Sequence, residues 1–298
     1  MFNRVLVGVD GRQGGRDAIA LATRLTAPAG KLTLAHVYPY HRDPPVRGYD
    51  EYEAAQITRA RELLATASTE GGIEAHHRWT AGTSPGRGLH QLAEAVSADL
   101  LVVGSPQRGP LGRVLVGDDT RAALDGAPCA VAIAPTGYAS QSAVIRKVGV
   151  GYDGSAESER ALIVARALAA EVDAKLAALQ VVVFPWYMFS GPLAGDATMV
   201  GRLVDQARTR VAALGDIEAH ATAGPAAEQL ASWSASVDLL LVGSRGFGPI
   251  GRLAHGSTSR KLTCRARCPL LVLTRTRRTA AHPAHAVEDL ELAAARRR

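Results

Sequence analysis

Residues 5–11 read VLVGVDG and residues 148–154 read VGVGYDG, so a short apolar run followed by Asp-Gly occurs twice in this chain of 298 residues. The similarity continues in the same order, because residues 99–105, DLLVVGS, match residues 238–244, DLLLVGS. A period of about 140 residues is too long for a solenoid repeat and fits a whole domain. The sequence therefore predicts a duplicated domain.

Each copy has the residue pattern of a parallel α/β sheet. Short β-branched and leucine-rich runs alternate with longer alanine-rich amphipathic segments, which is typical of βαβ units. Continuous apolar runs such as residues 239–242, LLLV, suit strands buried on both faces. We expect two tandem doubly wound α/β domains, each a five-stranded parallel sheet with helices on both faces. The predicted strands lie near residues 4–9, 31–37, 74–80, 100–104 and 130–134 in the first copy and near 147–152, 175–183, 216–222, 238–243 and 270–274 in the second.

The domain boundaries follow from this pattern and from the charge distribution. We predict domains at residues 1–138 and 145–276, joined by a short polar junction, and a basic tail at 277–298 that is disordered. The net charge is +6, and residues 275–298 contribute half of it through six arginines against three acidic residues. No aromatic residue lies among these arginines to stack on bases, so we expect no nucleic-acid partner.

The composition is that of an ordinary globular protein, with 47% hydrophobic and 21% charged residues. The chain contains no apolar run of the roughly 18 residues that span a bilayer and no apolar leader, so we expect a cytoplasmic protein without a membrane partner. Cys129, Cys264 and Cys268 form no even disulfide framework and lack the further ligands of a zinc site. We interpret them as ordinary thiols and predict no metal site.

The residues after the first and fourth strands of the second copy are candidates for a ligand site. Ligands of open parallel sheets bind beyond the carboxyl ends of the strands, where the strand order reverses. Asp153 follows the first strand, and a loop rich in glycine and hydroxyl residues begins at Gly243. Glycines let the backbone approach a polyanion, and the helix N-terminus beyond the loop offers unpaired N–H groups. The alternative, that Ser257 or Thr258 is only a helix N-cap and the glycines only turn residues, stays open at this point.

The loop resembles a family motif. The spacing Gly243-x2-Gly246-x9-Gly256-Ser257 matches, without a gap, the G-2x-G-9x-G-(S/T) motif of nucleotide-binding universal stress proteins. The Asp-Gly pair after the first strand and the Cys-Pro or Ala-Pro pair before the last strand are similar to that family as well. The resemblance covers nearly the whole chain and implies the strand order 3-2-1-4-5 in each domain.

The resemblance also implies a binding site for ATP, or for AMP or ADP, with Mg²⁺ as an accompanying ion. Gly151 and Asp153 are expected to line the adenosine, and Val181 the adenine. Val242 and Gly243 are expected at the start of the loop. The residues expected to face the phosphates are Arg245, Gly246, Gly256, Ser257, Thr258 and Ser259.

The first copy departs from this motif at two positions. Gln107 stands where the motif has glycine, which strains the backbone by roughly 1–3 kcal/mol if a glycine-only conformation is required. Asp118 stands where the motif has a hydroxyl residue. Its negative charge would repel a phosphate about 4 Å away by roughly 4 kcal/mol. We expect the first copy to bind ATP weakly or not at all, unless Mg²⁺ held by Asp118 and Asp119 reverses the charge. The positions that still suit an adenosine or keep the motif are Asp10, Val37, Gly104 and Gly117.

The sequence favours nucleotide binding over catalysis. The run Gly246-x-Gly248-x-x-Gly251 follows a fourth strand and has no acidic residue about 20 positions on, so we reject a dinucleotide-dependent dehydrogenase. Near the loop only His255 and Asp153 have acid–base side chains, and we therefore expect no catalytic residues. The expected function is that of a regulatory or stress-response binding module. The alternatives are a slow ATP-hydrolysing or adenylyl-transferring enzyme and a pure protein-interaction module.

Beyond the nucleotide, we expect contacts with other protein domains. The resemblance implies that the two domains pair within the chain through their last strands, while a homodimer and the identity of a protein partner stay open. Residues 184–189, FPWYMF, are rich in aromatic residues and would cover the adenine, contact a partner or pack against their own domain.

Overall fold

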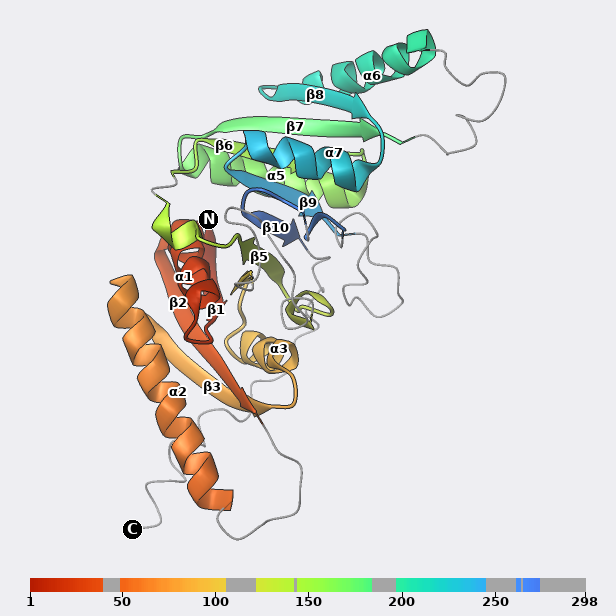
Figure 1. Cartoon of the computed structure of the whole chain (residues 1–298). Helices are drawn as coiled ribbons and strands as arrows, with labels where there is room; N and C mark the ends of the chain where they lie inside the picture. The colour runs from red at the N-terminus through yellow and green to blue at the C-terminus, as the bar shows by residue number, and fades with distance from the viewer. Residues whose placement is uncertain are drawn as a thin grey trace.

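The computed structural model describes residues 1–39, 49–105, 122–141, 144–183, 197–244, 261–263 and 265–273. Strands and helices alternate along both halves of the chain (Figure 1). The elements of the first half are β1 (Phe2–Gly8), α1 (Gln13–Leu25), β2 (Thr26–Pro39), α2 (Tyr49–Gly71), β3 (His76–Gly82), α3 (Pro85–Ala95), β4 (Leu100–Gly104) and β5 (Ala130–Ala134). A short 3-10 helix, η1 (Tyr138–Ser140), lies between the halves. The second half contains β6 (Lys147–Gly151), α5 (Ala156–Glu171), β7 (Lys175–Val182), α6 (Ala197–Ala212), β8 (Glu218–Ala223), α7 (Ala226–Trp233), η3 (Ser234–Ser236), β9 (Leu239–Gly243) and β10 (Leu270–Leu273).

All of these strands form one continuous ten-stranded sheet in the order β3-β2-β1-β4-β5-β10-β9-β6-β7-β8. Each half has the expected order 3-2-1-4-5 with parallel neighbours. The two halves meet where β10 pairs antiparallel with β5, so that Leu270 lies opposite Ile133 and Val272 opposite Val131. The last strands therefore pair within the chain, and the two predicted sheets fuse into one.

The antiparallel contact between β5 and β10 determines where the carboxyl ends of the strands lie. Strands within a half run parallel, whereas the two halves run in opposite directions across the contact. The carboxyl ends of β1 and β4 therefore lie at one edge of the sheet, and those of β6 and β9 at the opposite edge. The two candidate ligand regions thus lie at opposite ends of the strands, with the length of the sheet between them.

Helices cover both faces of the sheet, and each face has its own apolar core that continues from one half into the other. Val5 and Val7 of β1 face the core that contains residues of α1 and α5. Leu6, between them, faces the core formed with α3 and α7. Alternate residues of one strand thus point to opposite layers, which explains why the strands read as unbroken apolar runs.

Strand β2 begins earlier than predicted. Its expected start was near residue 31, but it begins at Thr26, directly after α1, where Phe2 pairs with Thr26 before a register shift brings Arg4 opposite Lys31. The early segment, TAPAG, contains Pro28 and Gly30, which are typical of a loop. Pairing with the start of β1 overrides that local preference.

One repeated aspartate holds the amino ends of the central strands together. Asp99 accepts hydrogen bonds from the backbone N–H groups of Asn3 and Arg4 at 2.9 and 3.0 Å. Asp238, its counterpart, accepts bonds from the N–H groups of Arg146 and Lys147, both at 2.8 Å. The aspartate that opens both DLL runs is therefore structural, and in each half it lies at the strand ends opposite to that half's own candidate ligand region.

The junction between the halves is fixed by a buried carboxylate of α1. Asp17 is fully buried and accepts hydrogen bonds from the backbone N–H groups of Gly137 and Ala139, both at 2.8 Å. The side-chain amide of Gln13 donates a third bond to Asp17 at 3.1 Å. Gly137 has a φ of 81°, a left-handed conformation that favours glycine. The polar junction is therefore anchored to the first helix.

The cysteines that the structure describes are buried thiols. Cys129 and Cys268 are both free, and Cys264 lies outside the described residues. Desolvation by burial raises the pKa of Cys129 to about 12 and raises that of Cys268 as well. None of the described helices combines the length and apolar character needed to cross a membrane.

Replacement of Asp17 by alanine is expected to destabilise the protein by about 1–3 kcal/mol, because the buried N–H group of Gly137 loses its acceptor. Urea unfolding followed by far-ultraviolet circular dichroism measures this change. The matched control is Glu74→Ala, at an exposed position, which should shift stability by less than about 0.5 kcal/mol. An unchanged urea midpoint for Asp17→Ala would contradict the assigned role of the carboxylate.

In a Cys264→Ser variant the remaining thiols, Cys129 and Cys268, should not react with a disulfide reagent at pH 8 while the protein is folded. Both are buried, and both have a raised pKa that keeps the unreactive thiol form. Absorbance of the released thiolate measures the reaction, and the same protein unfolded in urea is the positive control. Rapid labelling of the folded protein would show that these sites open readily.

Candidate functional site

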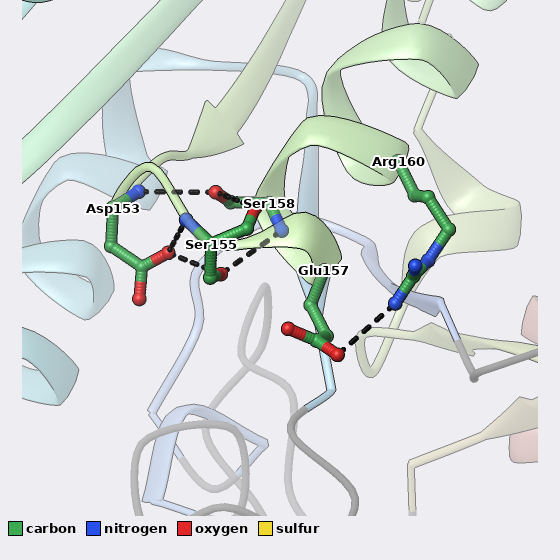
Figure 2. Close-up of polar contacts among 5 residues, drawn as sticks. All are labelled: Asp153, Ser155, Glu157, Ser158 and Arg160. Carbon is green, nitrogen blue, oxygen red and sulfur yellow. Dashed lines mark hydrogen bonds and ion pairs between the residues drawn. The ribbon is translucent and has the colours of Figure 1, made fainter.

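The loop between β6 and α5 orients the Asp153 carboxylate (Figure 2). The backbone N–H of Ser155 donates to Asp153 Oδ1 at 3.0 Å, and the Ser155 hydroxyl donates to the same oxygen. Gly154, between them, has a φ of 77°, in the left-handed region that glycine adopts without a steric penalty. The Asp-Gly pair thus makes the tight turn after β6 and leaves Asp153 at the carboxyl edge of the sheet.

The same residues also begin helix α5. Ser155 is the N-cap, and its hydroxyl oxygen accepts a hydrogen bond from the N–H of Ser158 at 3.3 Å. The Ser158 hydroxyl in turn accepts a bond from the N–H of Asp153 at 3.3 Å. Glu157 pairs with Arg160 at 3.1 Å in the first turn, as Figure 2 shows. An N-cap of this type stabilises a helix by about 1 kcal/mol, so the position of Asp153 and the start of α5 depend on each other.

Gly243 brings the end of β9 against this helix start. A Cβ atom added to Gly243 would lie 2.5 Å from the carbonyl oxygen of Glu157 and 2.6 Å from its carbonyl carbon. Backbone cannot move aside as a flexible side chain does, so only glycine fits at this position. The turn that holds Asp153 and the start of the glycine-rich loop therefore meet at the N-terminus of α5.

The other described positions of the expected adenosine site lie close to this meeting point. A Cβ atom on Gly151 would lie 3.3 Å from a methyl group of Val242, on the neighbouring strand β9. Gly151 also pairs with Leu179 of β7, which places Val181 two residues further toward the carboxyl edge. Val181 is partly buried and packs against the same core as Val242. The structure thus places Gly151, Val181 and Val242 near one another.

The first half has the same backbone arrangement with different side chains. A Cβ atom on Gly104 would collide with the backbone of Gly14 at the start of α1, so the close contact of strand and helix is repeated. The N–H of Arg12 donates to Asp10 Oδ1 at 3.0 Å, as Ser155 does to Asp153. Arg12, however, is an N-cap without a side-chain hydrogen bond. The first half thus keeps the backbone arrangement of the second but has no hydroxyl at the N-cap to support its aspartate.

Val37 occupies the strand position that matches Val181, since Gly8 pairs with Ala35 just as Gly151 pairs with Leu179. Its methyl groups lie against two glycines, because a Cβ atom on Gly88 would lie 2.6 Å from Val37 Cγ1 and one on Gly82 would lie 2.9 Å from it. The wall beside Val37 is therefore built from a valine side chain packed on bare backbone.

Tyr152 was not predicted from the sequence as part of the site. Its hydroxyl donates a hydrogen bond to the carboxylate of Glu159, which ties the loop to the first turn of α5. This bond is the main reason why the pKa of Tyr152 is raised to about 12. The phenol therefore stays neutral beside Asp153. The seven-residue separation across a turn gave no signal for this pair.

Ser244, directly after Gly243, is a second residue that sequence analysis did not single out. It is 1% exposed, and among the residues described its hydroxyl is one of the few buried polar groups without a hydrogen-bond partner. Such a group costs about 1–3 kcal/mol unless a partner is supplied. A buried donor and acceptor thus lies where the expected ligand loop begins.

The expected phosphate end of the site lies outside the described residues. This applies to Arg245, Gly246, Gly256, Ser257, Thr258 and Ser259, and to Gly117, Gln107 and Asp118 of the first half. The aromatic segment 184–189 and the tail 277–298 lie outside them too. Within the described ranges, no group of three or more histidine, cysteine, aspartate or glutamate side chains is placed to hold a metal ion.

Comparison with known proteins identifies the family. The model of the universal stress protein family matches residues 1–135 and 145–274. A universal stress protein of Mycobacterium tuberculosis is 25% identical over 291 residues, covering 90% of this chain and 99% of that protein. One of Thermus aquaticus is 29% identical over 134 residues, covering 44% of this chain and 97% of that protein.

A solved structure extends the comparison to the fold. The crystal structure of a universal stress protein from Archaeoglobus fulgidus superposes with a TM-score of 0.67 at 19% identity, covering 92% of this chain and 98% of that one. At this identity the likeness shows the α/β fold alone. The family, in contrast, is established by the two matches of its model, one in each half. This chain therefore belongs to the universal stress protein family and contains two copies of its domain.

Proposed function

We propose that this protein binds an adenine nucleotide, ATP foremost, at the carboxyl edge of its second half and acts as a regulatory module in a stress response. The observation that carries the proposal is the meeting of the Asp153 turn and Gly243 at the N-terminus of α5. That meeting lies where the strand order reverses, between β6 and β9, which is where open α/β sheets bind their ligands.

The described residues fit the adenosine part of such a ligand. Asp153 is held in one orientation by Ser155, so its carboxylate is available as a pre-oriented acceptor for ribose hydroxyl groups. Gly151 and Val181 line an apolar edge suited to a purine ring. Ser244 supplies a buried hydroxyl that gains a partner if a polar ligand occupies the edge. Together, these features suit a ligand that combines polar groups with a flat apolar ring.

The phosphate part of the proposal rests on the loop sequence. Gly246 and Gly256 permit close approach of the backbone, and the hydroxyl residues Ser257, Thr258 and Ser259 precede a helix-compatible stretch. N–H groups and hydroxyls at such a position stabilise phosphate. Arg245 adds a positive charge, and Mg²⁺ accompanies the triphosphate in this proposal.

The proposed activity is binding without efficient catalysis. Ser155 orients the Asp153 carboxylate, and the proposal assigns that carboxylate to ribose binding and not to catalysis. His255 is the other acid–base side chain near the loop in the sequence. The proposal keeps the cytoplasmic location expected from the sequence and leaves the protein partner unnamed. Slow ATP hydrolysis or adenylyl transfer and a pure interaction role are the outcomes that the tests below distinguish from it.

The double variant Gly246→Gln/Ser257→Asp should bind ATP about a hundredfold more weakly than the unaltered chain. It places the glutamine and the aspartate of the first half in the second, and the backbone strain and the charge repulsion expected from them are each worth roughly 1–4 kcal/mol. Isothermal titration calorimetry of the full chain with ATP and Mg²⁺ measures the affinity and the number of sites. The matched control is Gln107→Gly/Asp118→Ser, the reverse exchange in the first half, which should leave the strong site unchanged and improve the weak one. Full ATP affinity in the first double variant would disprove the proposed role of the loop.

The unaltered protein saturated with ATP and Mg²⁺ should release phosphate far more slowly than about 1 s⁻¹, the lower end of ordinary enzyme turnover. A coupled phosphate-release assay measures the rate, with the double variant as the background control. Turnover at or above that value, abolished in the double variant, would establish an enzyme instead of a binding module.

A further inference from the structure

The side-chain amide of Gln229 lies at the carboxyl edge of the second half, beside the strands that carry the expected adenine position. Gln229 belongs to the first turn of α7 and is partly buried. A Cβ atom added to Gly224 would lie 2.8 Å from Gln229 Nε2. Gly224 in turn donates its N–H to the carbonyl of Val182 at 3.0 Å. The amide therefore lies beside Gly224, where β7 and β8 end.

The first half shows what the residue equivalent to Gln229 contacts. Leu89 and Leu230 occupy equivalent places, since a Cβ atom on Gly8 would lie 3.0 Å from Leu89 and one on Gly151 would lie 3.1 Å from Leu230. The residue before each leucine is Gly88 in the first half and Gln229 in the second. The position before the leucine thus lies directly against residue 37 in the first half.

The two halves therefore differ at one wall of the site. In the first half, a Cβ atom on Gly88 would lie 2.6 and 2.7 Å from the two methyl groups of Val37, so no side chain fits there. In the second half, the same position carries the carboxamide of Gln229, and Val181 is the counterpart of Val37. The second half thus adds a carboxamide where the first half has a glycine.

The chemistry of the amide suits the edge of an adenine ring. A glutamine side chain offers an N–H donor and a carbonyl acceptor side by side, which matches the 6-amino group and the adjacent ring nitrogen of adenine. Within the part of the chain described above, the Gln229 amide is not engaged in a hydrogen bond. Its bonding capacity is therefore available to a ligand at this edge.

We propose that Gln229 is a specificity-determining residue of the second half, whose amide recognises the 6-amino edge of adenine. This inference rests on the proposed function, because it requires a nucleotide with its base near Val181. It adds to that function a side chain that selects the base.

The test compares two ligands on the full chain. The variant is Gln229→Leu, which keeps the size of the side chain and removes both hydrogen-bonding groups. The probes are ATP and purine riboside triphosphate, which lacks the 6-amino group, each titrated calorimetrically with Mg²⁺. The matched control is Gln91→Leu, on the exposed surface of α3, which should bind both probes as the unaltered chain does.

The expected result is that Gln229→Leu binds ATP about tenfold more weakly and loses most of the preference for ATP over the analogue. Equal weakening of both probes would indicate a merely structural role and overturn the inference, as would unchanged affinity and preference. If the unaltered chain binds ATP but the variant is indistinguishable from it, the proposed function stands without this residue. If the unaltered chain binds no ATP, the proposed function fails and the inference with it.

Discussion

The antiparallel pairing of β5 with β10 is the contact on which the rest of the architecture depends. It joins two parallel sheets of opposite direction into one, and it makes each apolar core continuous across both halves. The same pairing sets the candidate sites at opposite edges of the sheet. The junction can therefore be short, because β5 ends at the edge where β6 begins. Asp17 fixes that junction by accepting the N–H groups of Gly137 and Ala139.

The strands and their approximate bounds were predictable because both faces of the sheet are buried. Runs such as residues 239–242 contain only apolar residues and cannot be placed at a surface. The early start of β2 at Thr26 was not predictable, since its Pro28 and Gly30 signal a loop and only pairing with β1 extends the strand. The strand order required the resemblance to a family, because the sequence pattern does not determine which strands are neighbours.

In the candidate site, too, some features could be predicted from the sequence and others could not. Asp153 and Gly243 were predictable from their places after the first and fourth strands, where ligands of such sheets bind. Ser155 could have been identified as an N-cap from its place after Asp-Gly. The bond from Tyr152 to Glu159 and the buried hydroxyl of Ser244 depend on packing between separate segments, which no local pattern encodes. Gln229 became visible only when its equivalent, Gly88, was located in space.

The contact between β5 and β10 has a further consequence for how such a protein changes over generations. In a symmetric dimer of identical chains, every substitution appears on both sides of the axis, so a change that harms one site harms its twin. In a tandem chain the same contact is formed by two separately encoded strands. Arg12 can then stand at the helix N-cap of one half while Ser155 stands at that of the other. Covalent fusion of the two domains thus permits the two halves to carry different side chains at equivalent positions.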